Sequence, residues 1–305
     1  MLVKNIYELI GKTPLLELKH ENARIFLKLE NLNPGGSVKD RLAMQIITDA
    51  EQSGKITKNT EIIEATSGNT GVGLAMICAA KGYKLTIVMP ESMSMERRNI
   101  LEAYGANLIL TPANKGMKGA IEKAEEYHKN KPESFMPRQF ETESNAKAHY
   151  KTTAVEIFDD LNGKIDFFIA GVGTGGTFTG VSKYLKERIP DIKCIAVEPA
   201  NSAVLSGNDA GIHKIQGIGA GFAPKVLDKS LIDNIIKVTN EEAYTSAKEL
   251  ASKYGLLSGI SAGANVFAAL QTAAKAENKG KTIVTVIPDT GERYLSTDLF
   301  NSNNI

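Results

Sequence analysis

The sequence predicts an α/β fold in which mostly parallel, twisted sheets are covered by helices. From residue 37 onward, short apolar runs rich in β-branched residues alternate with segments of helical period, the pattern of parallel sheets with helices on their faces. Two groups of such units, near 60–115 and from 165 to the end, are separated by the polar stretch NKPESFMPRQFETESN. We therefore expect two domains with a cleft between them.

The apolar runs and amphipathic segments give the individual elements. Strands are expected at 61–65, 84–89, 107–110, 166–170, 193–198 and 281–287. Helices are expected at 38–53, 70–81, 94–104, 116–129, 143–160, 177–188, 241–254 and 262–277. Several helices end at a glycine for which we expect a left-handed C-terminal cap, namely Gly54, Gly82, Gly105 and Gly255.

Composition and charge favour a small-molecule partner. The 305 residues are 42% hydrophobic and 23% charged, which suffices for one large or two medium α/β domains, each with a buried core. The formal net charge is +1 and the basic residues are scattered, so we expect neither nucleic acid nor a membrane as partner. No apolar run approaches the roughly 20 residues that span a bilayer. The N-terminal MLVKNIYELIGKTP lacks the features of a signal peptide, so we expect a cytoplasmic protein.

The cysteines and histidines give no sign of a disulfide or a metal site. Cys78 and Cys194 lie far apart, each inside an apolar stretch, and both are expected to fill the core. The four histidines stand at positions 20, 128, 149 and 213. Because they show no ligand spacing such as His-x-x-x-His, we expect no metal.

The turn EATSGNTGVGLAM is the first place where chemistry is expected, because ligands of open α/β sheets bind where strands run into helices. Hydroxyls, a carboxamide and backbone amides gather there at a helix N-terminus, which suits a carboxylate or a phosphate. A simpler interpretation is that Ser67 or Asn69 only caps the helix. The run of polar residues and glycine is longer than a cap requires: Thr66, Ser67, Gly68, Asn69 and Thr70.

The turn DFFIAGVGTGGTFTGVSKYLKER joins a buried strand to a helix through glycines and threonines. Amides exposed by the glycines, the helix dipole and the hydroxyls would hold a phosphate. The G-x-G-x-x-G match, with Glu198 some 20 residues later as a candidate ribose ligand, keeps an NAD-dependent oxidoreductase as a rival. A P-loop is excluded because no Lys-Ser or Lys-Thr follows the glycines. The turn comprises Gly171, Gly173, Thr174, Gly175, Gly176 and Thr177.

The turn LLSGISAGANVFAAL is less specific. Gly-Ser-Ala-Gly turns often serve close packing, and taken alone Ser261 is expected to be an N-cap.

Six motifs together resemble one enzyme family. In chain order they are NPGGSVKDRLA, EATSGNTGVGLA, GVGTGGTFTGVS, IQGIGAGFAP, GISAGA and GERYLST. They closely resemble the cysteine synthase (O-acetylserine sulfhydrylase) family of pyridoxal-phosphate enzymes, of tryptophan synthase β-like fold type II. Cystathionine β-synthases share much of the pattern, and the resemblance covers essentially the whole chain.

The family resemblance implies the domain organisation. It implies two three-layer αβα domains with the cofactor, pyridoxal 5'-phosphate, in the cleft between them. Residues 40–141 would form a smaller, mobile domain carrying the Asn69 substrate loop. Residues 1–39 plus 142–305 would form the larger, cofactor-binding domain.

The resemblance also implies a role for each site residue. Lys39 would form the Schiff base and move the α-proton, Asn69 would lie beside the ring hydroxyl, and Ser261 would bond the pyridine nitrogen. The phosphate would lie on Gly173, Thr174, Gly175, Gly176 and Thr177. The substrate would be bound by Thr66, Ser67, Gly68, Thr70 and Gln139, with Gly219 of GIGAGF at the entrance.

The implied reaction is a β-replacement that makes L-cysteine from O-acetyl-L-serine and sulfide through an α-aminoacrylate intermediate. Ala65, Ala262 and the PDTGERY stretch depart from the commonest pattern of the family. They leave open a condensation of serine or cysteine with homocysteine, or release of hydrogen sulfide from cysteine. A non-enzymatic anion-binding module is a third class. The resemblance further implies a homodimer and a possible regulatory partner such as serine acetyltransferase.

Overall fold

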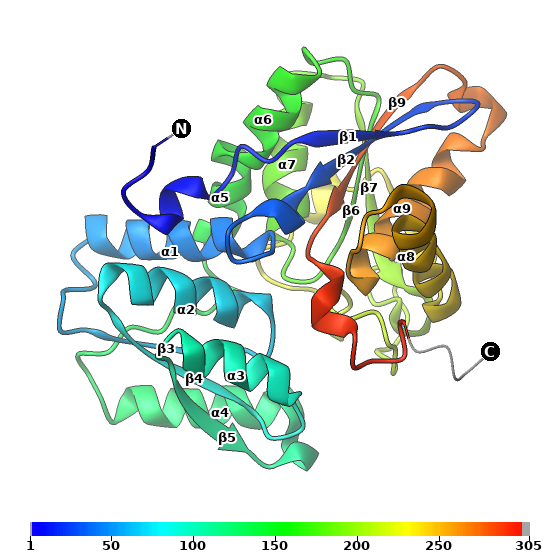
Figure 1. The fold of residues 1–305 in the computed structure, drawn as a ribbon. Helices are drawn as coiled ribbons and strands as arrows, with labels where there is room; N and C mark the ends of the chain where they lie inside the picture. Colours follow the sequence, from blue (N-terminus) through cyan, green and yellow to red (C-terminus); the bar gives the residue numbers. More distant parts are fainter. Residues whose placement is uncertain (1, 301–305) are drawn as a thin grey trace. The chain divides into compact units, whose positions relative to one another are not determined.

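The computed structural model describes residues 2–300, which form two compact units (Figure 1). Unit 1 contains the chain up to Ile10 and Asn33–Ser144, and unit 2 contains Gly11–Leu32 and the chain from Asn145 onward. The expected boundaries at 40 and 141 differ from this division. The N-terminal segment belongs to unit 1 because Tyr7 and Ile10 pack against its core. Mobility of the smaller domain stays a prediction.

Unit 1 is built on a parallel sheet of order β3-β4-β5. Its strands are β3 (Glu61–Ala65), β4 (Lys84–Pro90) and β5 (Asn107–Thr111), which confirm the strands expected there. Its helices are α1 (Lys39–Gln52), α2 (Asn69–Lys81), α3 (Met95–Ala103) and α4 (Gly116–Lys129), with short 3-10 turns at Ile6–Leu9 and Ala113–Lys115.

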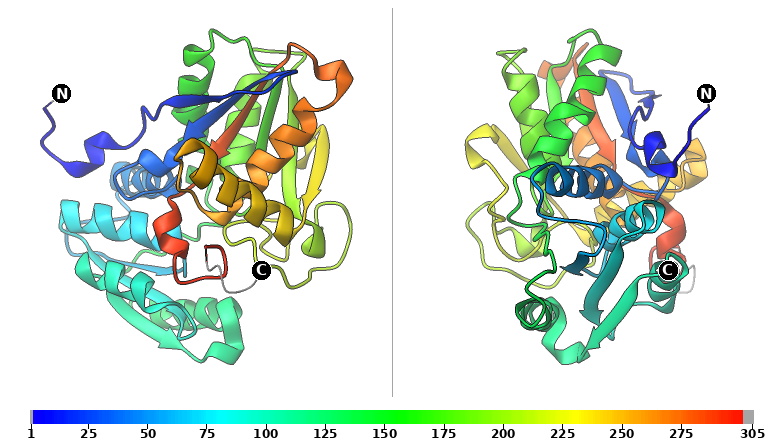
Figure 2. Two further views of the ribbon diagram at one scale, coloured as in Figure 1. Left: turned by 45° about the vertical axis from the view of Figure 1, so that its right-hand side comes forward. Right: turned by 90° about the vertical axis from the view of Figure 1, so that its left-hand side faces the viewer.

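The two faces of the unit 1 sheet bury different helices. Ile62 and Ile87 point into a core shared with α1 and α2, whereas Ile63 and Val88 pack against α4. Alternate strand residues thus cover opposite faces, as the two-residue period requires. The result is a three-layer arrangement of helices, sheet and helix (Figure 2). Within it α1 and α2 approach closely, because a Cβ at Gly73 would lie 3.1 Å from the Lys39 carbonyl oxygen.

Unit 2 is built on a larger sheet of order β1-β2-β9-β6-β7-β8, in which β1 alone among the described strands runs antiparallel to its neighbour. The strands are β1 (Leu15–Leu18), β2 (Arg24–Leu29), β6 (Phe167–Gly171), β7 (Lys193–Pro199), β8 (Asn234–Val238) and β9 (Thr282–Ile287). The sequence did not predict β1, β2 and β8. The two edge strands are short and partly exposed, and β2 carries a charged residue, Lys28, in a buried position.

Helices cover both faces of this second sheet as well. Ile169 and Ile195 share a core with α8 and α9, while Phe168 and Cys194 share one with α6 and α7. The helices are α5 (Ser144–Lys151), α6 (Thr153–Asp160), α7 (Gly176–Lys186), α8 (Asn240–Tyr254) and α9 (Ile260–Ala273). Short 3-10 turns lie at Glu30–Leu32, Ala200–Ser202, Lys229–Leu231, Ala276–Asn278 and Gly291–Tyr294.

The helix expected at 143–160 is wrong as a single element. It divides into α5 and α6 at Thr152, whose φ of −127° and ψ of −75° are not helical. The Thr152 hydroxyl donates to the Ala148 carbonyl oxygen at 2.7 Å, a local bond of the kind that bends helices. The break lets α7 cross α5 closely, since a Cβ at Gly180 would lie 2.2 Å from the Ala146 carbonyl oxygen.

The four glycines expected as left-handed caps are confirmed, with φ between 67° and 82°. Cys78 and Cys194 are buried and unpaired in the core, as predicted. Burial raises the pKa of the Cys78 thiol to about 12 and that of the Cys194 thiol to about 11. Within the described residues, no helix has the length and apolar character needed to cross a membrane.

Candidate functional site

Lys39 is the first residue of α1 and is half-buried. Its amide donates to the Ser37 hydroxyl oxygen at 3.2 Å. The preceding turn is fixed by Asp40, whose Oδ2 accepts from the Gly35 amide at 2.6 Å. A Cβ at Gly35 would lie 2.6 Å from Asp40 Oδ1, which explains a glycine there. The lysine therefore extends from an ordered helix start with a carboxylate in the first turn.

The turn between β3 and α2 is built without a side-chain cap. The N-cap of α2 is Gly68, which has no side chain to cap the helix, so the interpretation of Ser67 or Asn69 as the N-cap is wrong. Thr66 Oγ1 accepts from the Gly68 amide at 3.3 Å. Arg97 of α3 donates to the Ser67 carbonyl oxygen at 2.7 Å, a contact that was not predicted from the sequence.

Gln139 lies against this turn. The Thr70 hydroxyl donates to Gln139 Oε1 at 2.7 Å, and both side chains are buried. Two residues placed far apart by the sequence are thus brought together at the start of α2. The amides of Arg138 and Gln139 donate in turn to the carboxylate of Glu64 on β3, at 2.9 Å and 3.2 Å.

Glu64 was not predicted from the sequence to lie near the site. It is 2% exposed, and burial raises the pKa of its carboxyl to about 7, although the two amides and the charge of Arg138 act in the opposite direction. The available signal was a charged residue near the end of the otherwise apolar strand EIIEA.

The glycine-rich turn of unit 2 is held by close backbone contacts. A Cβ at Gly173 would lie 2.2 Å from the Gly217 carbonyl oxygen, and one at Gly176 would lie 1.8 Å from Asn145 Oδ1. Gly175 is the N-cap of α7 with φ of 85°, a conformation that favours glycine. These contacts require glycine at three of the positions predicted to form the phosphate cradle.

The same turn has the donors that a phosphate needs. Among the described residues, the amides from Gly173 to Thr177 find no hydrogen-bond acceptor. The turn contains no lysine or arginine, so a bound dianion would be held by these amides, the threonine hydroxyls and the N-terminal end of the α7 dipole. The residues therefore fit a phosphate group.

His149 also contacts the site and was not predicted from the sequence to do so. It is fully buried on α5, with its Nε2 3.2 Å from Thr177 Oγ1 and its Nδ1 2.9 Å from Thr153 Oγ1. The imidazole thus fixes the hydroxyl of a predicted phosphate ligand. A single histidine in a helix gives no sequence signal for such a role.

Ser261 lies near the same turn within unit 2. It is the second residue of α9, whose N-cap is Gly259, so the expectation of an N-cap is wrong. Gly217 lies between Ser261 and the glycine-rich turn. A Cβ added at Gly217 would lie 3.4 Å from Ser261 Oγ, and the Gly217 carbonyl oxygen faces Gly173. Gly219 follows, and its amide donates to the Val172 carbonyl oxygen at 3.0 Å.

Glu198, the candidate ribose ligand, lies near the end of β7, and its carboxylate is bonded to the segment that follows the strand. It is 2% exposed, and its carboxylate accepts from the Leu205 amide and from the amide and hydroxyl of Ser206, at 2.5 to 3.1 Å. It therefore holds the turn after β7 together and has no free edge for a ribose.

The predicted residues thus fall into two groups, one in each unit. Unit 1 carries Lys39, Thr66, Ser67, Gly68, Asn69, Thr70 and Gln139. Unit 2 carries Gly173, Thr174, Gly175, Gly176, Thr177, Gly219 and Ser261.

Comparison with known proteins gives matches along nearly the whole chain. Residues 6–289 match the family described as pyridoxal-phosphate dependent enzyme. The chain is 55% identical over 297 residues to cysteine synthase B of Campylobacter jejuni, covering 97% of this chain and 98% of that protein.

Solved structures agree with these matches. The cysteine synthase of Entamoeba histolytica superposes with a TM-score of 0.96 at 46% identity, covering 98% of this chain and 91% of that one. A hydrogen sulfide-producing enzyme of Fusobacterium nucleatum superposes with a TM-score of 0.93 at 50% identity, covering 97% and 99%.

Proposed function

Because the chain belongs to the family of pyridoxal-phosphate dependent enzymes, we propose that it joins sulfide to the β-carbon of O-acetyl-L-serine, giving L-cysteine and acetate. The observation that carries the proposal is the similarity to cysteine synthase B of C. jejuni over nearly the full length of both chains. The predicted family, its cofactor and the α/β fold with mostly parallel sheets are confirmed. Two observations argue against the rival interpretation as an NAD-dependent oxidoreductase. The family match is to pyridoxal-phosphate dependent enzymes, and the carboxylate of Glu198, the candidate ribose ligand, is bonded to the segment after β7.

The turn that opens α7 is our proposed site for the cofactor phosphate. Its amides and the hydroxyls of Thr174 and Thr177 would bind the phosphate oxygens, with His149 orienting the second hydroxyl. Ser261 would hydrogen-bond the pyridine nitrogen. When bound, pyridoxal phosphate supplies an electron-withdrawing ring that stabilises negative charge at the α-carbon of an amino acid. A neutral hydroxyl at the nitrogen leaves that ring a moderate electron sink, which suits loss of a β-substituent.

Lys39 is our proposed catalytic residue. Its Nζ would bond the cofactor aldehyde between turnovers and take the α-proton of the substrate during them. The ordered start of α1, held by the bond from Gly35 to Asp40, keeps the base of this side chain in one place.

The turn that opens α2 is our proposed site for the amino-acid substrate. The carboxylate would accept hydrogen bonds from the Thr66–Gly68 turn and from the side chains of Thr70 and Gln139. Asn69 would lie beside the cofactor ring hydroxyl. Gly219 would line the entrance.

A second candidate function is release of hydrogen sulfide from cysteine. The similarity to the hydrogen sulfide-producing enzyme of F. nucleatum favours it, at 50% identity over almost the whole of both chains. Both functions would use the same lysine and the same carboxylate site. They differ in the group that leaves the β-carbon, which is acetate from O-acetylserine or hydrosulfide from cysteine, and in the nucleophile that then adds.

A product assay separates the candidates. Purified protein would be given O-acetylserine, serine or cysteine as donor against sulfide or homocysteine as acceptor. We expect the fastest turnover with O-acetylserine and sulfide; faster release of sulfide from cysteine would favour the second candidate.

The protein should be yellow and lose its visible absorption in borohydride. A Lys39→Ala variant that still made cysteine would contradict the proposed mechanism.

The oligomeric state, the partner and the location are proposals that rest on the family resemblance alone. We propose a cytoplasmic homodimer with a regulatory partner such as serine acetyltransferase. Size-exclusion chromatography with light scattering tests the dimer, and titration of the purified acetyltransferase tests the partner.

A further inference from the structure

A buried carboxylate stands beside the proposed substrate site without belonging to it. Glu64 is the fourth residue of β3, two residues before Thr66, and is 2% exposed. The neighbouring segment follows the edge of the same strand: the Ile63 amide donates to the Phe135 carbonyl oxygen, and the Phe135 amide donates to that of Glu61, both at 2.9 Å. A carboxylate buried in such a place is costly unless hydrogen bonds satisfy it.

Two consecutive amides satisfy the Glu64 carboxylate. Oε2 accepts from the Arg138 amide at 2.9 Å and Oε1 accepts from the Gln139 amide at 3.2 Å. Arg138 has a φ of 58°, rare for a residue with a side chain, and successive amides in such a turn point toward one place and form an anion-binding nest. Glu64 supplies the anion that fills this nest, and its two oxygens accept the hydrogen bonds of amides held in an unfavourable backbone conformation.

The nest fixes the residue that faces the substrate site. Gln139 is 6% exposed, and its Oε1 accepts from the hydroxyl of Thr70, which is 2% exposed. The peptide group from 138 to 139 therefore sets where the Gln139 carboxamide lies relative to the first turn of α2. Glu64 connects both halves of the site, by sequence to the turn at Thr66 and by hydrogen bonds to Gln139.

We propose that Glu64 is a positioning residue for the amino-acid substrate. It acts through Gln139: the carboxylate holds the main chain so that the carboxamide is ready to bind the substrate carboxylate. This inference rests on the proposed function, because it takes Thr70 and Gln139 as ligands of that carboxylate.

The holoenzyme variant Glu64→Gln gives the direct test. A glutamine can accept only one of the two amide hydrogen bonds with its oxygen, and its NH₂ group would face the other amide N–H. We expect the KM for O-acetylserine to rise about tenfold, in line with loss of one hydrogen bond to a charged group. The visible absorption of the cofactor and the KM for sulfide should stay unchanged.

A double-mutant cycle with Gln139→Ala distinguishes positioning from a general structural effect. If Glu64 acts through Gln139, the Glu64→Gln change adds little to the KM of a Gln139→Ala enzyme. If the two effects on KM multiply, the proposal is wrong. Glu64→Asp keeps both acceptor oxygens and the charge, so its KM should lie between those of the wild type and Glu64→Gln. Should Glu64→Gln fail to fold, Glu64→Asp carries the test with the same cycle.

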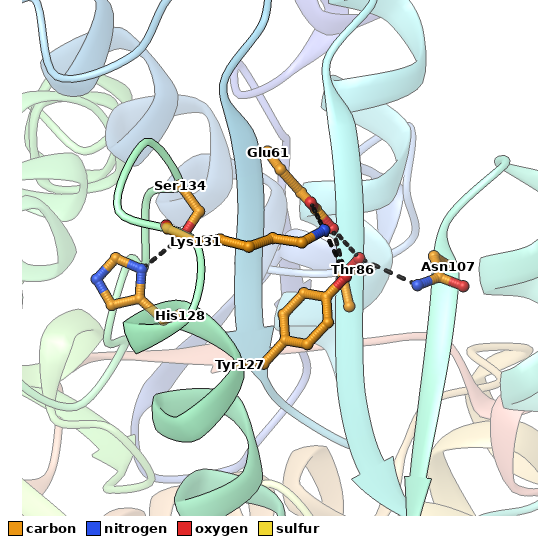
Figure 3. A network of polar contacts seen from close by, with 7 residues as sticks. All are labelled: Glu61, Thr86, Asn107, Tyr127, His128, Lys131 and Ser134. Carbon is orange, nitrogen blue, oxygen red and sulfur yellow. Dashed lines mark hydrogen bonds and ion pairs between the residues drawn. The ribbon is translucent and has the colours of Figure 1, made fainter.

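Glu61 on the same strand offers a matched control. Its carboxylate joins Lys131 Nζ at 2.5 Å and Thr86 Oγ1 at 2.5 Å, in a network at the opposite end of β3 that also contains Tyr127 (Figure 3). A Glu61→Gln variant should lower stability and leave the KM for O-acetylserine unchanged. Glu125→Gln removes the carboxylate that lies 3.5 Å from the Arg138 guanidinium, and it should leave KM unchanged too.

Hydrogen exchange separates failure of this proposal from failure of the proposed function. The amides of Arg138 and Gln139 should exchange faster in Glu64→Gln than in the wild type or Glu61→Gln, whatever the reaction is. Faster exchange with an unchanged KM would overturn the positioning role while leaving the function intact. A wild-type enzyme that makes no cysteine would overturn the function itself.

Discussion

Thr70 donates its hydroxyl proton to Gln139 Oε1 over 2.7 Å, which joins the first turn of α2 to a residue 69 positions further along the chain. The bond fixes the face that Gln139 presents at the helix start. In the proposed substrate site the carboxamide NH₂ group of Gln139 would be the donor to the substrate carboxylate, because a carboxamide oxygen can only accept.

Thr70→Val tests this contact, because valine keeps the shape of threonine and removes the donor. The buried Oε1 loses its partner, which costs about 1–3 kcal/mol. We expect the KM for O-acetylserine to rise about tenfold, measured by steady-state kinetics. Thr86→Val removes a hydroxyl from β4 in the same unit and should leave this KM unchanged. An unaltered KM in Thr70→Val would contradict the assignment.

Gly173→Ala tests the phosphate site. The added Cβ would lie 2.2 Å from the Gly217 carbonyl oxygen, so the loop must move away from its present path. We expect cofactor occupancy to fall about tenfold or more, measured as pyridoxal phosphate released per chain. Gly255→Ala is the control: it has φ of 67° and nothing within 4 Å, so it should lose about 1 kcal/mol of stability and keep its cofactor. Full occupancy in Gly173→Ala would place the phosphate elsewhere.

The pH dependence of stability tests the burial of Glu64. Its pKa is raised to about 7 from 4.5, mainly by desolvation, and the charged side chain that acts on it is that of Arg138, which pairs with Glu125 of α4. The folded state therefore binds this proton more tightly than the unfolded state. The unfolding free energy consequently falls as pH rises from about 4.5 to about 7, by about 3 kcal/mol in all.

Urea unfolding at pH 5 and pH 8 measures this effect. Relative to Glu64→Gln, which has no such proton, the wild type should lose about 3 kcal/mol between the two pH values. The ionised carboxylate fills the nest above pH 7, so the KM difference between the two enzymes should be larger at pH 8 than at pH 6. A stability difference that is the same at both pH values would refute the raised pKa.

The ion pair of Lys28 and Glu156 provides a stability prediction for unit 2. Lys28 is fully buried on β2, with its Nζ 3.0 Å from Glu156 Oε2 and 2.5 Å from the Thr13 carbonyl oxygen. Glu156→Gln leaves a buried ammonium without its main partner and should cost about 3 kcal/mol, measured by urea unfolding. Asp160→Asn changes a half-exposed carboxylate 3.6 Å from the same Nζ and should cost less than about 1 kcal/mol. Equal losses in the two variants would argue against the assignment of Glu156 as the main partner.

The sequence by itself determined the parts whose signal is local. The strands β3, β4, β5, β6, β7 and β9 were predicted because each is an apolar run of strand length. The left-handed glycines, such as Gly82 and Gly255, follow a helical segment directly and have the one residue type that tolerates this backbone. The ordered glycine and hydroxyl motifs likewise carried the family resemblance, because a phosphate cradle needs donors that are adjacent in the chain.

Only the tertiary structure decided the contacts that join distant residues. Strand β2 was not predicted, and it carries Lys28, a charged residue in a buried position. The burial of Lys28 depends on Glu156, which belongs to a helix on the sheet face. Glu64 and His149 acquired their partners in the same way, across 75 and 28 residues. A hydrogen bond to a buried polar group can come from any segment that packing brings near. Periodicity and motif spacing record only neighbours along the chain, and therefore could not show these partners.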